Sequence, residues 1–368
     1  MRAIQAGNTF NIFDDSIEIY EELPARTYSV EYSDMKGCYL SLHSDLEVNE
    51  KIYGVHEQKA EKALTTFGIL DRGLGIILSG DKGMGKSVFA RLLCKKAIGK
   101  GIPVIIVSEC VPGIANFIES INQECVVLFD EFDKTFDTCR GQDERDEQAQ
   151  LLSLFDGVAT GKRLYIVTCN EIYNLNDYLI NRPGRFHYHF RFDYPEVSEI
   201  EEYLRDKLQP EYYSQIKDVV AFSSKVNLNY DCLRSIAFEL NLGNSFAETI
   251  NDLNILNTSK KSFDVTLYYE NGRMLHRYSC SMNLFMNEGD DLWITMYGEK
   301  GLRIAEVKVD RTKIEYDVAN NASVVKANGL YIDYVDPDDE PDVNTYKNLK
   351  PSYMTIEKNG MRNLRYTV

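Results

Sequence analysis

The sequence has no segment of the kind that inserts a protein into a membrane. Its amino-terminal stretch, MRAIQAGNTFNIFDD, lacks the apolar run of a signal peptide. No stretch reaches the roughly 18 consecutive apolar residues that are needed to span a bilayer. We therefore predict a soluble, cytoplasmic protein without a membrane partner.

Metal-binding cysteine patterns are also missing, although the chain has eight cysteines and five histidines. No two cysteines form a C-x-x-C pair and no histidine stands near them at ligand spacing, which argues against a zinc site. Cys125 and Cys169 lie instead in apolar runs, as small buried residues of a reducing compartment do. The two histidines of HYHF, at 187–190, read as rim or core residues, because no third ligand accompanies them.

Positive charge is scarce, since 41 Lys and Arg stand against 57 Asp and Glu and give a net charge of −16. A field of this sign repels nucleic acid and anionic membranes, so nucleic acid is a disfavoured partner. Apolar residues are not scarce. A hydrophobic fraction of 44% in 368 residues is enough for two or three domains with their own cores.

One motif carries recognisable chemistry. GDKGMGKS, at 80–87, fits G-x-x-x-x-G-K-[ST], with an apolar strand before it and a helix after it. In a phosphate-binding loop of this kind, glycines turn backbone N–H groups inward and the lysine reaches the β and γ phosphates. The alternative is a Gly-rich turn that binds nothing. The predicted nucleotide-binding residues here are Gly80, Asp81, Lys82, Gly83, Met84, Gly85, Lys86, Ser87 and Val88.

Polar side chains follow the next apolar strands. Asp130 and Glu131 come directly after CVVLF, and sites in parallel sheets lie at that end of the strands. We predict that Asp130 and Ser87 hold Mg²⁺ and that Glu131 polarises the attacking water; the alternative is an acidic, solvated strand rim. Asn170, after RLYIVTC, is either a group that orients water and senses the γ-phosphate or an asparagine in a turn.

Hydrophobic periodicity divides the chain into four parts. Residues 1–50 alternate in strand-and-turn fashion, 51–195 interleave apolar strands with helices, 196–257 are helical, and 258–368 alternate again, opening with a hairpin about ENGR. The predicted fold class is α/β: a P-loop NTPase core with a parallel sheet and a helical lid. A small N-terminal β region and a C-terminal, mostly-β domain flank this core.

The segment LLSLFDG…RLYIVTCNEIYNLNDYLINRPGRF resembles the second region of homology of AAA ATPases, the AAA clade proper of the AAA+ superfamily. The resemblance covers about residues 51–257, and in general style the chain also resembles phage-encoded AAA ATPases. It implies a Mg²⁺-dependent ATP hydrolase in a homo-oligomeric ring, for which six members are the family expectation. It also implies that Arg182 and Arg185 are arginine fingers that reach the neighbour's γ-phosphate; the alternative is a surface ion pair.

Three further positions follow from the same resemblance. Tyr53 and Gly54, in KIYGVH, match the stretch that packs on adenine, although core packing explains Tyr53 equally well. Arg234 stands where AAA+ relatives carry a second sensor arginine on the lid. Members of the AAA clade proper usually lack that arginine, so the alternative is a solvated lid residue.

The sequence departs from the family at the pore loop. Unfoldases of this clade carry an aromatic–hydrophobic–Gly loop between the second strand and the Asp-Glu strand. Here the interval 110–124 offers Val111-Pro112-Gly113, with no aromatic residue before the glycine. This departure argues against simple threading of a polypeptide. The charged segment 136–148 is an alternative pore lining, but it reads more simply as a solvated loop.

The predicted function is ATP-driven remodelling of a protein or macromolecular complex, with the β-rich flanks recruiting a client that the sequence does not name. The alternative is a nucleotide-controlled assembly or scaffold protein with slow turnover. A third function, nucleic-acid loading or translocation, is disfavoured by the net charge of −16.

Overall fold

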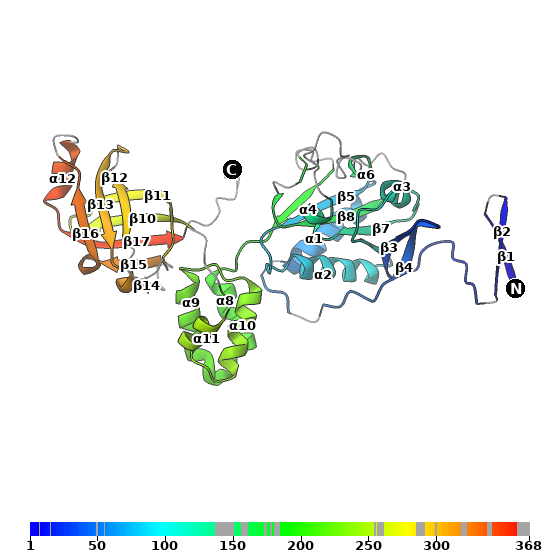
Figure 1. The fold of residues 1–368 in the computed structure, drawn as a ribbon, viewed down its shortest axis with the longest axis horizontal. Helices are drawn as coiled ribbons and strands as arrows, with labels where there is room; N and C mark the ends of the chain where they lie inside the picture. Colours follow the sequence, from blue (N-terminus) through cyan, green and yellow to red (C-terminus); the bar gives the residue numbers. More distant parts are fainter. Residues whose placement is uncertain are drawn as a thin grey trace. The chain divides into compact units, whose positions relative to one another are not determined.

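The computed structural model divides the chain into two compact units, Met1–Asp193 and Tyr194–Val368 (Figure 1). The structure describes residues 1–6, 8–14, 16–48, 51–54, 56–136, 151–155, 161–172, 175–176, 179, 185–253, 255, 261–284, 291–298, 300–317, 322–336 and 341–358. The boundaries at residues 50, 195 and 257 stay predictions.

A seven-stranded sheet forms the middle of the first unit, in the order β4-β3-β6-β7-β8-β5-β9 (Figure 1). Its strands are β3 (Thr27–Ser33), β4 (Gly37–Leu42), β5 (Leu74–Ser79), β6 (Val104–Val107), β7 (Cys125–Phe129), β8 (Arg163–Cys169) and β9 (Tyr188–Arg191). All neighbours are parallel except β3 and β4. Every residue of β5 to β8 is buried, because the sheet is covered on both faces.

Helices lie on the two faces of this sheet (Figure 1). One face packs in a single apolar cluster with α3 (Ile114–Glu119), α4 (Phe132–Thr135) and α6 (Leu152–Phe155). The paired helices α1 (His56–Ile69) and α2 (Lys86–Gly99) lie on the other face. Because β5 sits between β8 and β9, the strand order reverses beside it, and ligands of such sheets bind at the carboxyl ends of the strands near that point.

The strands β3 and β4 form the hairpin that the alternation around DMKG predicts, with Gly37 at a φ of +68° after the turn. The structure adds a feature that the alternation does not predict: β3 pairs in parallel with β6 and so extends the central sheet. The strands β1 (Arg2–Ala6) and β2 (Thr9–Phe13) form a separate, two-stranded sheet.

The second unit begins with helices that the sequence predicts over 196–257. They are α8 (Val197–Lys207), α9 (Ile216–Ser223), α10 (Tyr230–Asn241) and α11 (Phe246–Asp252), with a 3₁₀ helix, η2 (Pro210–Gln215), before α9. Both α8 and α11 start at a capping box. In each, the side chain of the residue before the helix accepts a hydrogen bond from the N–H of the third helical residue, and the Glu side chain at that third position accepts one from the N–H of the residue before the helix.

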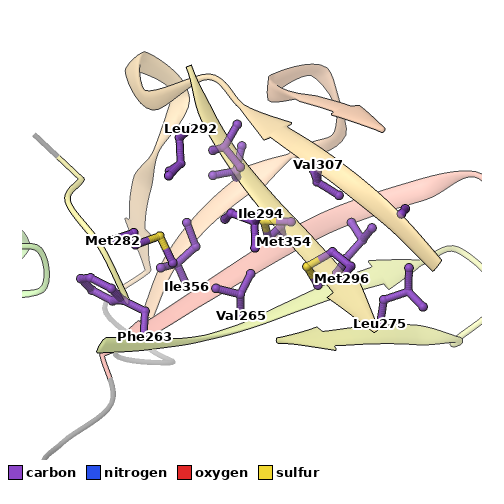
Figure 2. Packing of buried hydrophobic residues seen from close by; sticks show 14 of the residues in the cluster. Phe263, Val265, Leu275, Met282, Leu292, Ile294, Met296, Val307, Met354 and Ile356 are labelled. Atoms are coloured by element: carbon purple, nitrogen blue, oxygen red, sulfur yellow. The ribbon is translucent and has the colours of Figure 1, made fainter. Parts of the chain in front are cut away.

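The rest of the second unit is an eight-stranded antiparallel half-barrel, in the order β14-β15-β17-β10-β11-β12-β13-β16. Its strands are β10 (Lys261–Tyr269), β11 (Met274–Met282), β12 (Leu292–Tyr297), β13 (Arg303–Val309), β14 (Glu315–Asp317), β15 (Ala322–Lys326), β16 (Leu330–Tyr334) and β17 (Pro351–Lys358). A short helix, α12 (Asn344–Lys347), precedes β17. Figure 2 shows that side chains from alternate strand positions, such as Val265 and Ile294, meet in one apolar core.

The predicted fold class is confirmed: a parallel α/β core, a small N-terminal sheet and a C-terminal antiparallel β domain. Cys125 and Cys169 are buried, as their apolar surroundings predict. Across the described residues, no helix combines the length and the hydropathy that a bilayer crossing requires.

Candidate functional site

The loop at 80–87 joins β5 to α2, and three of its glycines have positive φ: +148° at Gly80, +75° at Gly83 and +90° at Gly85. A Cβ at Gly80 would lie 2.2 Å from the carbonyl oxygen of Phe192, so the loop passes too close to this backbone for any side chain. Gly85 directly precedes α2, whose first N–H groups lack intrahelical acceptors. The loop therefore ends on a helix N-terminus that favours an anion.

The Lys86 side chain lies inside this loop and is only 8% exposed. Its ammonium group donates hydrogen bonds to the carbonyl oxygens of Gly80 and Asp81 and, over 3.1 Å, to Oδ1 of Asn170. Burial lowers the pKa of Lys86 from its usual value, while nearby carboxylates oppose this shift. These three acceptors are neutral, so they do not cancel the positive charge of Lys86. That charge can therefore attract an anion to the loop.

The turn after β7 places two carboxylates at the edge of the sheet. The hydroxyl of Thr168, on β8, donates to Oδ1 of Asp130 over 2.7 Å and accepts from the backbone N–H of Glu131 over 2.8 Å. Glu131 has a φ of 48° and a ψ of 44°, in the left-handed region that non-glycine residues rarely adopt. The sequence marked both carboxylates but not Thr168.

The carboxylate of Glu131 is 54% exposed and forms an ion pair with Lys134, one turn further along α4. The hydrogen bond from Lys134 is the largest of the effects that lower the pKa of Glu131 below its usual value. Glu131 is therefore a carboxylate at neutral pH, as a water-polarising group must be. No sequence pattern indicates this contact of Lys134.

Asn170 lies at the end of β8 and connects the loop to α4. Its Oδ1 accepts from Lys86, and its backbone N–H donates to Oδ2 of Asp133 over 3.0 Å. Asp133 also accepts, over 3.4 Å, from the N–H of Glu171. Asp133 thus fixes the strand end that carries Asn170, a role that the sequence did not reveal.

The other loop residues differ in exposure. Asp81, Lys82 and Ser87 are exposed, Val88 is half-buried, and Met84 is buried at 2% exposure. The exposed hydroxyl of Ser87 and the carboxylate of Asp130 are oxygen donors, which Mg²⁺ prefers. These donors fit the metal, and the loop and Lys86 fit the phosphates of ATP. Over the described ranges, no three His, Cys, Asp or Glu side chains gather into a metal cluster.

The structure describes four of the remaining predicted residues, each in its own local surroundings. Tyr53 is buried, with the Lys51 ammonium 5.1 Å from its ring centre, and Gly54 has a φ of +67°. Arg185 is only 7% exposed, and Arg182 lies outside the described residues. Arg234 is on α10 in the second unit, with its side chain 54% exposed and 3.6 Å from the Asp231 carboxylate.

Comparison with known proteins identifies the family of this part of the chain. Residues 76–194, which include the loop, both carboxylates and Asn170, match the family model "ATPase family associated with various cellular activities (AAA)". The chain is 26% identical, over 220 residues, to the ATP-dependent zinc metalloprotease FTSH 11, chloroplastic/mitochondrial, of Arabidopsis thaliana, covering 56% of this chain and 26% of that protein.

Two further relatives are of the same kind. The ATP-dependent zinc metalloprotease FTSH 9, chloroplastic/mitochondrial, of Oryza sativa subsp. japonica is 26% identical over 52% of this chain and 25% of its own length. The ATP-dependent zinc metalloprotease FtsH of Alkalihalophilus pseudofirmus is 28% identical over 36% of this chain and 22% of its own. The chain thus spans about a quarter of the length of these relatives. Residues 76–194 of this chain are an AAA ATPase family domain.

Proposed function

We propose that the chain is a Mg²⁺-dependent ATPase that works as a homo-oligomeric ring, with six members, and couples hydrolysis to remodelling of a protein or macromolecular complex. The observation that supports this most is the convergence of Lys86, Asp130 and Asn170 at the carboxyl ends of three adjacent strands, β7, β8 and β5. Of the properties that the relatives' names state, we extend only ATP dependence to this chain.

Each residue has a distinct part in this proposal. Bound ATP with Mg²⁺ would supply the phosphoanhydride bond that is cleaved. Lys86 would contact the β and γ phosphates, and Ser87 and Asp130 would hold the metal. Glu131 would orient and polarise the attacking water, and Asn170 would hold that water against the γ-phosphate.

The roles outside the loop belong to the same proposal. Tyr53 and Gly54 would contact adenine, and Arg234 would act as a second sensor. Arg182 and Arg185 would complete the site of a neighbouring subunit. Arg185 would have to leave its buried position in the single chain to do so.

The client is proposed to be a protein that the β regions recruit and that is not simply threaded. Gly113, with a φ of +80°, leads directly into the short helix α3. The three residues before that helix, at 111–113, are partly or fully exposed and carry no aromatic ring. An exposed segment without an aromatic side chain supports the proposal that the client is not simply threaded.

A second candidate function is a nucleotide-controlled assembly protein with slow turnover. One observation favours it: the carboxylate that should act on water, Glu131, is engaged by Lys134. If this ion pair persists when ATP binds, the nucleotide would hold the ring in one state for a long time, and hydrolysis would serve as a timer.

Two variants test the ATPase proposal. Lys86→Ala should bind a fluorescent ATP analogue weakly or not at all, because the γ-phosphate loses its main cationic contact. Glu131→Gln should bind the analogue normally but hydrolyse ATP about 10²–10⁴-fold more slowly, the usual contribution of a group that positions or deprotonates water. Steady-state phosphate release and equilibrium fluorescence measure the two effects.

Lys95→Ala is the matched control, because Lys95 is an exposed lysine on the same helix as Lys86. It should bind and hydrolyse ATP like the unmodified protein. Normal affinity in Lys86→Ala would show that the loop is not the nucleotide site. Normal hydrolysis in Glu131→Gln would remove the role assigned to Glu131.

A further inference from the structure

Thr168 occupies a position between the two carboxylates that nothing in the motifs identifies. Its side chain is on β8 and is only 1% exposed. Its single hydroxyl bridges the strand ends: it donates to Oδ1 of Asp130 over 2.7 Å and accepts from the N–H of Glu131 over 2.8 Å. One buried hydroxyl therefore contacts both acidic residues of the proposed site.

The direction of these two hydrogen bonds is fixed by chemistry. A backbone N–H can only donate, so the hydroxyl oxygen accepts from Glu131 and its one proton is left for Asp130. A hydroxyl that donates to one oxygen of a carboxyl group holds that group in one orientation. Oδ1 of Asp130 accepts the hydrogen bond from Thr168, and Oδ2 of the same carboxylate is then the oxygen that can face a cation.

The place of Thr168 in the sheet explains why a side chain is needed here. The ladder between β7 and β8 ends at the pair Phe129 and Val167. Beyond it, the chain after β7 leaves the sheet, and the N–H of Glu131 has passed the last backbone partner on β8. The Thr168 hydroxyl supplies the missing acceptor at the residue whose φ of 48° bends the chain.

We propose that Thr168 is a positioning residue that sets the Asp130 carboxylate for Mg²⁺ and, through one hydroxyl, the backbone of Glu131 for the attacking water. This inference rests on the proposed ATPase function. It predicts that the metal requirement and the rate of hydrolysis depend on the hydroxyl of residue 168 and not on its shape.

Two substitutions separate hydroxyl from shape. Thr168→Val keeps the branched shape and removes both hydrogen bonds, whereas Thr168→Ser keeps the hydroxyl and removes a methyl group. The first readout is binding of a fluorescent ATP analogue while the Mg²⁺ concentration is raised, which does not depend on turnover. The second readout is kcat for phosphate release at saturating Mg²⁺.

Thr168→Val should bind the analogue without metal as the unmodified protein does, but need about 10–100-fold more Mg²⁺ for the metal-dependent gain in affinity. Loss of a group that orients a metal ligand typically has that effect. Its kcat should fall as well, while Thr168→Ser should restore both quantities nearly to normal. If Thr168→Val folds poorly, Thr168→Cys gives the same test, because a thiol is a much weaker donor and acceptor.

The contrary outcomes are distinguishable. An unchanged Mg²⁺ requirement in Thr168→Val would overturn the positioning role while leaving the ATPase proposal intact. Equal losses in Thr168→Ser and Thr168→Val would show that shape, not the hydroxyl, matters, and would also overturn it. If the unmodified protein binds no nucleotide at any Mg²⁺ concentration, the proposed function itself fails, and this inference with it.

Discussion

At the scale of single residues, the ion pair between Glu131 and Lys134 is the contact that bears most directly on turnover. Both side chains are about half exposed, at 54% and 42%, so the pair is weak and water can replace it. Glu131 is nonetheless held toward α4 by its left-handed backbone and by this lysine. The pair therefore competes with the water that Glu131 is proposed to polarise.

Removing Lys134 should speed hydrolysis. Lys134→Met keeps the apolar stem but frees the carboxylate, and the pKa of Glu131 should rise toward its usual value, which makes Glu131 a stronger base. An exposed pair is worth about 0.2–1 kcal/mol, so kcat should increase about 1.4- to fivefold with little change in affinity for an ATP analogue. Lys95→Met is the control. A lower kcat in Lys134→Met would show that the lysine helps the reaction.

The residues of the proposed site fall into two groups: those that a local sequence motif identifies, and those whose hydrogen-bond partners are distant in the sequence. Spacing within one motif is enough to mark Lys86 and Ser87, and an apolar strand followed by acidic residues marks Asp130. The roles proposed for these residues stay predictions. Thr168 and Asp133 carry no such mark, because their hydrogen bonds join the end of β8 to the segment that follows the end of β7. Only the parallel pairing of β7 with β8 brings those ends together.

At the scale of elements, two half-buried imidazoles link α1 and β9 to their neighbours in the first unit. His56, at the start of α1, stacks on Phe192 with ring centres 4.8 Å apart. Nε2 of His189, on β9, forms a 2.6 Å hydrogen bond with Oγ of Ser79, the last residue of β5. Burial is the main cause that lowers the pKa of each histidine to about 4.

These two histidines should make the stability of the protein depend on pH between 6.5 and 4. Their pKa in the folded state is below the unfolded value of 6.5, so the unfolded chain binds more protons in this window. Their contribution is complete above pH 6.5 and is lost as the pH falls toward 4. A shift of this size corresponds to ~3 kcal/mol for each ring, and partial exposure reduces it to ~1–2 kcal/mol.

Urea denaturation at a series of pH values measures this dependence. His56→Phe keeps a ring against Phe192, and His189→Gln keeps a hydrogen-bonding group near Ser79, but neither new residue titrates. The double variant should therefore lose less stability between pH 6.5 and 4 than the unmodified protein. His187→Gln, at an exposed imidazole, is the matched control substitution. A slope that the double variant leaves unaltered would contradict the prediction.

The elements also show where sequence patterns stop being informative. β5, β7 and β8 were predicted because a strand buried on both faces is a continuous apolar run between turn residues. The hairpin of β3 and β4 was predicted from alternation and a turn. The parallel pairing of β3 with β6 was not predicted. That contact joins segments about 75 residues apart, and no local pattern specifies such a partner.

At the scale of the whole molecule, the ring is the prediction that reaches furthest beyond a single chain. The proposed site has its loop and both carboxylates in one chain, but the arginines assigned to it belong to the neighbour. Arg185 is 7% exposed, so Arg185→Ala would also disturb packing, and its effect on turnover would be ambiguous. Arg182→Ala is therefore the variant of choice for testing a role in trans.

If Arg182 acts in trans, hydrolysis per subunit should rise steeply with protein concentration, because a site is complete only between two subunits. Arg182→Ala should still bind an ATP analogue, since Lys86, Ser87 and Asp130 remain in its own chain, but its turnover should fall. Arginine fingers contribute on the order of 10³–10⁵ in rate in other phosphoryl-transfer systems. A mere surface ion pair would contribute about 1 kcal/mol or less to stability and leave turnover almost normal.

Mixing two inactive variants gives the decisive measurement. Rings of Arg182→Ala lack the Arg182 finger at every interface, and rings of Glu131→Gln lack every water-polarising carboxylate. In mixed rings, some interfaces pair the intact Glu131 of one subunit with the intact Arg182 of the next, so phosphate release should reappear and pass through a maximum as the mixing ratio is varied. If Glu131 and Arg182 instead served one site within the same chain, each variant would lack one essential group in every site, and mixing would restore no activity. Turnover that is independent of concentration, with no recovery on mixing, would leave a monomeric P-loop switch as the function of this domain.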